Sequence, residues 1–130
     1  MTIVTNVLIL VSWVMLWHFV ADFVAQNDWM ATNKSSNWMA LSLHVGFYSL
    51  IMFAFVGMAP YILWDDKLWF LAITFVSHFS TDAITSRITS YLWKKEKRHW
   101  FFVTVGFDQL IHAVTLFWTL WYVVNWETFR

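Results

Sequence analysis

The sequence predicts an all-α fold, a polytopic membrane protein built as a bundle of four transmembrane helices. Of its 130 residues, 60% are hydrophobic and 12% are charged, whereas soluble domains carry charge on about 25% of their residues. Eight basic and eight acidic residues cannot give a soluble protein of this size a polar surface. The apolar residues also fall into four stretches, each at least as long as the roughly 20 residues that a spanning helix needs.

Three polar breaks separate the four predicted helices. The first is rich in Asn and Ser, the second holds the only proline, Pro60, and the third is a basic run from Lys94 to His99. Proline and clusters of polar residues mark turns, and connections this short make successive helices antiparallel neighbours. We therefore expect one integral membrane domain over residues 1–130, with helices at about 4–25, 38–58, 68–93 and 100–126.

The distribution of basic residues predicts how these helices are oriented. Lys and Arg accumulate in the cytoplasmic loops of membrane proteins. In this topology Lys67 and Arg130 lie on one side, and the other side holds Lys34, Arg87, Lys94, Lys95, Lys97 and Arg98. We expect an integral protein of the bacterial inner membrane, with both termini outside and the Lys94–Arg98 loop in the cytoplasm.

Charge and cysteine content exclude several classes of function. The formal net charge is zero, whereas nucleic-acid-binding domains are usually basic. The sequence has no cysteine, which excludes disulfides and thiolate metal sites. The expected partners are the lipid bilayer and a lipid-linked substrate, with no nucleic acid, and a homo-oligomer is left open.

Ionisable residues inside the predicted helices form His/Asp pairs four residues apart, which places both members of a pair on one helix face. Such residues cost several kcal/mol at bilayer depth, so we expect them to face the bundle interior. At a rise of about 1.5 Å per residue, most lie roughly 5 to 20 Å from the cytoplasmic ends of their helices, which predicts one polar chamber. The set comprises His18 and Asp22, His44 alone on its helix, His78 and Asp82, and Asp108 and His112.

This set has the composition of a metal site. Imidazoles and carboxylates on the facing helices of a bundle suit a divalent transition metal such as zinc, manganese or iron. Two divalent ions and one hydroxide would balance three buried carboxylates, which favours two ions bridged by an Asp over one ion. All seven residues are candidate metal ligands, and Asp22, Asp82 and Asp108 are also the candidate catalytic residues. In the alternative interpretation, each pair only joins helices by hydrogen bonds.

Three further polar residues share these helix faces and are candidates for binding substrate or orienting the ligands. They are Gln26, Tyr48 and Gln109. Mutation of residues that hold ligands in place typically costs about 10 to 100-fold in metal affinity or activity. Hydrogen bonding between helices is an equally good interpretation of the two glutamines.

Four segments carry a pattern that extends over nearly the whole chain: HFVADFVAQNDWMATNK, LHVGFYSL, SHFSTDAITSR and FDQLIHAVTL. With H-x-x-x-D-F-x-x-Q in the first helix and D-Q-x-x-H in the last, the chain resembles a family of small four-helix bacterial and phage membrane proteins of unknown function. More distantly it resembles the membrane-bound metal-dependent hydrolases, which also carry His and Asp residues in membrane helices. That second resemblance implies hydrolysis but identifies no substrate.

The leading hypothesis is an intramembrane metal-dependent hydrolase that activates a bound water. A chamber about one headgroup layer below the cytoplasmic surface suits a lipid-linked or amphipathic phosphate ester. The alternatives are a metal-ion or proton-coupled transporter that uses the same His/Asp chamber, and a structural or interaction membrane protein. Transport requires access from both faces, whereas the outer half of the predicted bundle has few polar residues.

Overall fold

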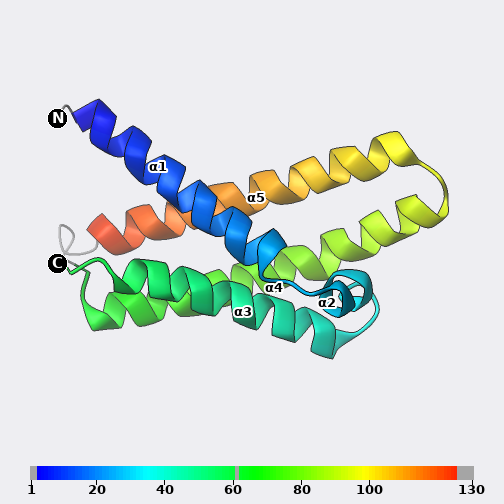
Figure 1. Ribbon diagram of the computed structural model, residues 1–130, viewed down its shortest axis with the longest axis horizontal. Helices are drawn as coiled ribbons and strands as arrows, with labels where there is room; N and C mark the ends of the chain where they lie inside the picture. Colours follow the sequence, from blue (N-terminus) through cyan, green and yellow to red (C-terminus); the bar gives the residue numbers. More distant parts are fainter. Residues whose placement is uncertain (1–2, 61, 126–130) are drawn as a thin grey trace.

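The computed structural model describes residues 3–60 and 62–125, which form helices joined by short connections (Figure 1). No strand occurs among these residues, so the predicted all-α class is confirmed. The predicted helix end at Trp126 and the basic residue Arg130 lie outside the described residues. The elements are α1 (Ile3–Phe19), the π-helical turn η1 (Val20–Val24), α2 (Asp28–Asn33), α3 (Trp38–Gly57), α4 (Trp64–Lys94) and α5 (Arg98–Asn125).

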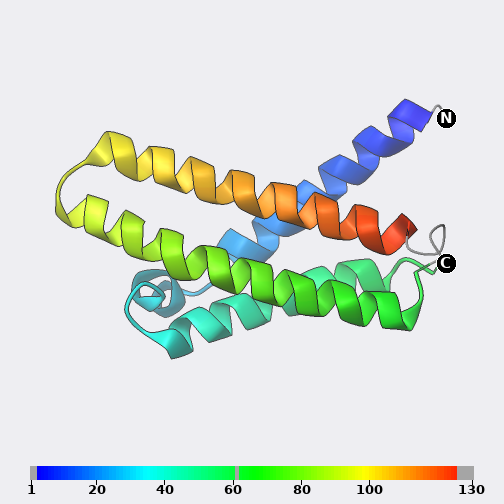
Figure 2. The same ribbon diagram turned by 180° about the vertical axis from the view of Figure 1, so that it is seen from behind.

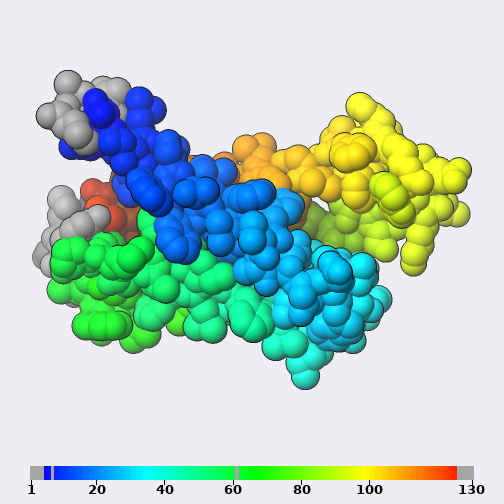
Figure 3. Space-filling view, viewed as in Figure 1, coloured from blue at the N-terminus to red at the C-terminus, as the bar shows by residue number. Residues whose placement is uncertain are grey.

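The longest helices, α4 and α5, form an antiparallel hairpin, and α3 packs along α4 (Figures 1 and 2). Helix α1 crosses α3 obliquely, and its N-terminal half diverges from the bundle. The turn between α4 and α5 lies at the same end of the molecule as α2, and the start of α1 lies at the opposite end with the connection between α3 and α4. The space-filling view shows α1 and α2 packed against α3 (Figure 3).

Two of the connections differ from the sequence prediction. The break after the first helix contains α2, because Asn27 caps it by accepting a hydrogen bond from the Met30 amide and the Met30 side chain is buried. Helix α4 begins at Trp64, four residues earlier than expected, so Asp65 and Asp66 lie in its first turn. Carboxylates near a helix N-terminus are stabilised by the helix dipole, and charged residues of a break can therefore extend the helix that follows.

The turn between α4 and α5 closes with an unusual backbone conformation. Glu96 has a φ of 56°, in the left-handed region where glycine is usually found. The amides of Glu96 and Lys97 donate to the carbonyls of Trp93 and Leu92 at 3.0 Å each, and these bonds satisfy the C-terminal end of α4. The basic run thus forms a tight reversal that keeps α4 and α5 side by side.

The burial pattern differs from that of a soluble protein. Among the described residues, 13 of the buried ones are polar or charged and 13 are hydrophobic. At the same time large apolar side chains are exposed along every long helix, including Leu10, Leu50, Ile84 and Trp118. Soluble proteins bury mainly apolar residues, so both the buried polar side chains and the exposed apolar ones depart from that pattern.

Within the described residues, two helices, α3 and α5, are long and apolar enough to cross a membrane. Only 11% of the apolar window of α5 is buried within the chain, whereas a core helix of a soluble protein would be mostly buried. Helix α1 with η1 contains a shorter apolar stretch, Leu8–Val24. Helix α4 is also long enough to cross a membrane, but its polar residues lower its mean hydropathy. Several of these polar residues, including His78 and Asp82, are buried.

Candidate metal centre

Four buried side chains from three elements converge beside the middle of α4. Asp22 comes from η1, His44 from α3, and His78 and Asp82 from successive turns of α4. None of the four is more than 3% exposed. The four-residue spacing of His78 and Asp82 brings both onto the face of α4 that packs against α3.

Within the trio Asp22, His44 and His78, the separations among the nearest ligand atoms are those of a metal site, and Asp82 adds a further oxygen beside the two histidines. His44 Nε2 lies 3.1 Å from Asp22 Oδ1 and 3.2 Å from Asp82 Oδ2. His78 Nε2 lies 3.3 Å from His44 Nε2, 3.4 Å from Asp22 Oδ1 and 3.8 Å from Asp82 Oδ2. Ligand atoms bound at about 2.0–2.1 Å around a tetrahedral cation are about 3.3–3.4 Å apart. The donor set therefore fits a cation such as zinc, and the buried His/Asp groups could hold a metal.

One of these ligand atoms lacks a hydrogen bond. Asp22 Oδ1 is fully buried and makes no hydrogen bond of normal geometry, although His44 Nε2 is 3.1 Å away. An unsatisfied buried polar atom costs roughly 1–3 kcal/mol. A cation held between the two histidines and two aspartates would remove that cost.

A second group of ligands continues from Asp82 toward α5. Asp82 Oδ1 lies 3.6 Å from His112 Nε2, while Oδ2 of the same carboxylate faces His44. His112 Nδ1 lies 3.4 Å from Asp108 Oδ2, and the Thr85 hydroxyl donates to Asp108 Oδ1. Asp82 thus has one oxygen toward each group, which is the arrangement of a bridging carboxylate.

His18 lies beside these groups and belongs to none of them. Its Nδ1 is 2.8 Å from the Tyr48 hydroxyl, and its Nε2 is 3.0 Å from Gln109 Oε1. Because an amide oxygen only accepts, His18 Nε2 carries the proton and Nδ1 accepts from Tyr48. The structure therefore brings together six of the seven candidate ligands and gives His18 two hydrogen-bond partners instead.

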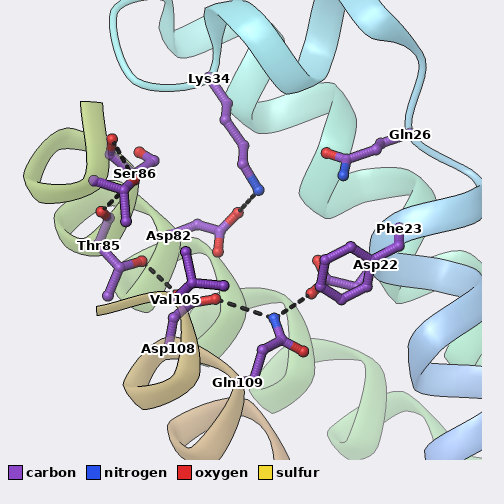
Figure 4. A pocket seen from close by; sticks show the side chains of 11 residues that line it. Asp22, Phe23, Gln26, Lys34, Asp82, Thr85, Ser86, Val105, Asp108 and Gln109 are labelled. Atoms are coloured by element: carbon purple, nitrogen blue, oxygen red, sulfur yellow. Dashed lines mark hydrogen bonds and ion pairs between the residues drawn. The ribbon is translucent and has the colours of Figure 1, made fainter. Parts of the chain in front are cut away.

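Gln109 and Tyr48 support the ligands directly. The Gln109 amide nitrogen donates to Asp22 Oδ2 at 2.8 Å and to Asp108 Oδ2 at 3.1 Å (Figure 4). The Tyr48 ring stacks on His78, with ring centroids 3.9 Å apart. A continuous chain of hydrogen bonds therefore runs from Tyr48 through His18 and Gln109 to the two carboxylates, and it fixes their orientation.

The π-helical turn is part of this arrangement. The Ala25 amide bonds to the Val20 carbonyl at 2.8 Å, five residues back instead of four. This wider turn shifts Asp22 relative to His18, so the two residues contact different partners despite their four-residue spacing. Single π-turns occur frequently at functional sites.

Lys34 also belongs to the candidate metal centre, although the sequence predicts it only as one of the basic residues on the cytoplasmic side. Its Nζ donates to Asp82 Oδ2 at 2.9 Å and lies 3.4 Å from His44 Nε2. Burial works against the charged form of Lys34, but the carboxylates of Asp82 and Asp22 outweigh it and raise the Lys34 pKa. No periodic signal predicts this contact, because Lys34 belongs to a connection whose path depends on α2.

A polar cavity of about 130 Å³ lies against the ligands on the side of Lys34 (Figure 4). The carboxylates of Asp22, Asp82 and Asp108 reach its wall, and so does Gln26, whose Oε1 is buried without a hydrogen-bond partner. The cavity gives the candidate metal centre room for a small polar molecule.

No curated protein and no solved structure matches the chain. The model of one family, described as "Protein of unknown function (DUF3307)", matches residues 8–129. That range includes every candidate ligand from Asp22 to His112 together with His18, Gln26, Lys34 and Gln109. The match agrees with the expected family of unknown function, and nothing in these comparisons supports the more distant resemblance to metal-dependent hydrolases. Since the match covers almost the whole sequence, the chain belongs to the DUF3307 family.

Proposed function

We propose that the chain is an intramembrane hydrolase that depends on a divalent transition metal. The observation that carries the proposal is the 3.1–3.4 Å spacing of the buried ligand atoms of Asp22, His44 and His78 beside a polar cavity. A cation bound there supplies Lewis acidity and activates water for attack. Sites that only join helices need no such cavity.

The remaining residues suit proton transfer and positioning. His112 makes no hydrogen bond through either ring nitrogen among the described residues, and Asp108 lies 3.4 Å from its Nδ1 at the cavity wall. This pair is placed to accept a proton from the attacking water and to return it to the leaving group. Gln109 holds Asp22 and Asp108 in their orientations.

The proposal includes four membrane spans with the basic turn in the cytoplasm. Helix α4 has 31 residues, which gives a length of about 46 Å at 1.5 Å per residue, against a hydrocarbon core of about 30 Å. Its polar residues are largely shielded by α3 and α5, and exposed apolar residues face outward. Helix α2 with Lys34 lies at the same end as the Lys94–Arg98 turn, which agrees with a cytoplasmic basic side (Figure 1).

Cysteine accessibility tests this orientation. We expect an impermeant thiol reagent added outside cells to label Asp65→Cys and not Lys95→Cys, because the two exposed positions lie at opposite ends of α4. Asp66 is a poorer probe because it is buried. External labelling of position 95 alone would reverse the proposed topology.

The surroundings of the cavity favour an amphipathic phosphate ester as the substrate. An apolar groove of about 520 Å³ lies between α4 and α5 and is lined by Ile84, Ile88 and Phe107. Thr85 lines both this groove and the polar cavity. An acyl or prenyl chain in the groove would therefore place a linked phosphate close to the metal centre.

Transport of a metal ion or protons is the second candidate function. Buried hydroxyls continue from the centre toward the opposite end of the bundle, and those of Ser49 and Thr74 make no hydrogen bond among the described residues. The cavity between His78 and Thr119 measures only about 10 Å³, and one water needs about 10–15 Å³. A hydrated ion does not fit this route, so the geometry favours hydrolysis.

The proposal is tested by metal content and phosphate release. We expect purified protein to carry a divalent transition metal and to release phosphate from members of a panel of lipid-linked phosphates. Asp82→Asn should lose both properties, whereas Asp65→Asn, an exposed aspartate on the same helix, should keep them. Metal-free protein from a chelator-free preparation would contradict the metal centre. Metal accumulation in vesicles without hydrolysis would replace the enzyme by the transporter.

A further inference from the structure

We propose that Lys34, Ser86 and Gln26 form an oxyanion subsite beside the metal centre, which binds the phosphoryl group of the substrate. This inference rests on the proposed function and deepens it. All three side chains line the polar cavity, and they come from three separate parts of the chain: the residue after α2, α4, and the connection after η1 (Figure 4).

The cavity has the size for such a group. Its volume of about 130 Å³ is roughly ten times the 10–15 Å³ that one water needs. A tetrahedral oxyanion fits in this space, whereas a whole lipid does not. An apolar chain attached to the anion would have to leave the cavity.

Ser86 provides a hydrogen-bond donor without a partner. The neighbouring hydroxyls of α4 bond to carbonyls of their own helix, as Thr81 does with Ser77 and Thr89 does with Thr85. Ser86 makes no such bond, although it is only 8% exposed and lies one turn after Asp82. Its hydroxyl is therefore free to donate to a molecule in the cavity.

Gln26 provides a second unsatisfied group. Its Oε1 is buried without a hydrogen-bond partner. Because no hydrogen bond fixes that oxygen, the amide can turn and present its NH₂ group to an anion, or accept from a protonated phosphate oxygen. Two unpartnered polar groups in one cavity indicate a polar ligand and not an empty packing defect.

Lys34 provides the charge, and it changes the charge balance of the centre. Three carboxylates and one ammonium leave a net charge of −2 on the cavity wall, from −3 and +1. One divalent cation therefore neutralises the site, and two give it a charge of +2, which matches a phosphate monoester. Without metal the carboxylates repel an anion, so phosphate should bind only after the metal.

The contact of Lys34 with Asp82 links the two sites. A cation coordinated by Asp82 Oδ2 would compete with the Lys34 ammonium for that oxygen. Lys34 is then available to an oxyanion that enters the cavity. Removal of this positive charge should weaken phosphate binding but should not weaken metal binding, because like charges repel.

The experiment measures binding of inorganic phosphate by calorimetry to the zinc-loaded full-length protein in detergent, with zinc content measured on each sample. We expect Lys34→Met to bind phosphate about tenfold or more weakly than the parent, since hydrogen bonds to charged groups are the strong ones. Lys34→Arg should recover most of the affinity, and Ser86→Ala should show a smaller loss. Lys94→Met, an exposed lysine of the basic turn, is the matched control.

Parallel titrations distinguish the source of the phosphate. Glycerol 3-phosphate and a short-chain phosphatidic acid share the headgroup, so tighter binding of the second assigns the subsite to a lipid-linked phosphate. Equal binding assigns it to a soluble phosphate ester.

Three results would overturn the subsite. Unchanged phosphate affinity in zinc-loaded Lys34→Met would overturn the subsite but would not contradict the proposed hydrolase function. Zinc-loaded parent protein that binds no phosphate would also do so. Parent protein that binds neither zinc nor phosphate would overturn the proposed function as well, and the zinc measurement separates this case from the other two.

Discussion

The start of α4 and the metal centre near its middle both bury charged residues, but their polar atoms are satisfied in opposite ways. Near the start of α4, Lys67 donates to the Gly57 carbonyl at 3.2 Å and lies over the Trp64 ring. Lys67 therefore links the C-terminal end of α3 to the first turn of α4. At the metal centre, Asp22 Oδ1 and both ring nitrogens of His112 make no hydrogen bond among the described residues. Burial of an ionisable group therefore does not distinguish structure from function. The distinguishing feature is the convergence of His and Asp ligand atoms from several helices, some of which make no hydrogen bond.

The same contrast separates two histidines at the centre itself. His18 and His44 are equally buried, but His18 uses both ring nitrogens in hydrogen bonds, whereas His44 directs Nε2 toward two carboxylates and a second imidazole. The comparison predicts different losses when each is replaced.

The largest effect is expected for His44→Gln. Disturbing a residue that only orients a ligand typically costs about 10 to 100-fold in metal affinity, so loss of a ligand should cost at least about 100-fold. His18→Gln should reduce zinc affinity by no more than about 10 to 100-fold, because His18 acts on the candidate ligands only through Tyr48 and Gln109. Competition with a chromophoric zinc chelator measures both, with the exposed His99→Gln as control. Equal losses at positions 18 and 44 would place His18 among the ligands.

A smaller effect on the same scale is expected for Gln109→Leu, which removes the donor to Asp22 and Asp108 and the acceptor for His18. We expect zinc affinity to fall about 10-fold or more, with the fold retained. Circular dichroism and thermal denaturation in detergent monitor the fold. Unchanged affinity would reduce Gln109 to a contact between helices.

Much of this arrangement follows from the sequence, and the rest depends on contacts between distant segments. Helical spacing predicts that His78 and Asp82 face inward together, because the cost of burying them applies wherever the helix lies. It cannot predict Lys34, whose approach to Asp82 depends on the fold of α2. Helical spacing also cannot predict that His18 hydrogen-bonds to Tyr48 and Gln109 instead of joining the candidate ligands, since both partners lie far along the chain.

Lys67→Met tests the structural end of the comparison. It removes the hydrogen bond to Gly57 and the contact of the ammonium with Trp64, and leaves a side chain of similar length. We expect a loss of about 1–2 kcal/mol in the free energy of unfolding, with zinc content unchanged. Lys95→Met, at an exposed lysine, should change neither quantity. A parallel loss of zinc would mean that the start of α4 and the metal centre are coupled and that Lys67 is not purely structural.

The smallest effect is expected at the turn between α4 and α5, where Glu96 has a φ of 56°. A left-handed conformation costs a residue with a side chain roughly 1–2 kcal/mol, and glycine avoids most of this cost but loses more entropy on folding. Glu96→Gly should therefore stabilise the protein by about 0.5–1 kcal/mol, seen as a higher melting temperature at unchanged zinc affinity. Glu96 is an acidic residue within a basic run, so its replacement also changes the local charge. Glu96→Ala is therefore the control, because it removes the same charge but keeps the backbone strain. If Glu96→Ala stabilises as much as Glu96→Gly, the gain comes from the charge and the backbone explanation fails. If only glycine stabilises, the tight reversal is a strained element that lies outside the metal centre and can be relaxed without affecting it.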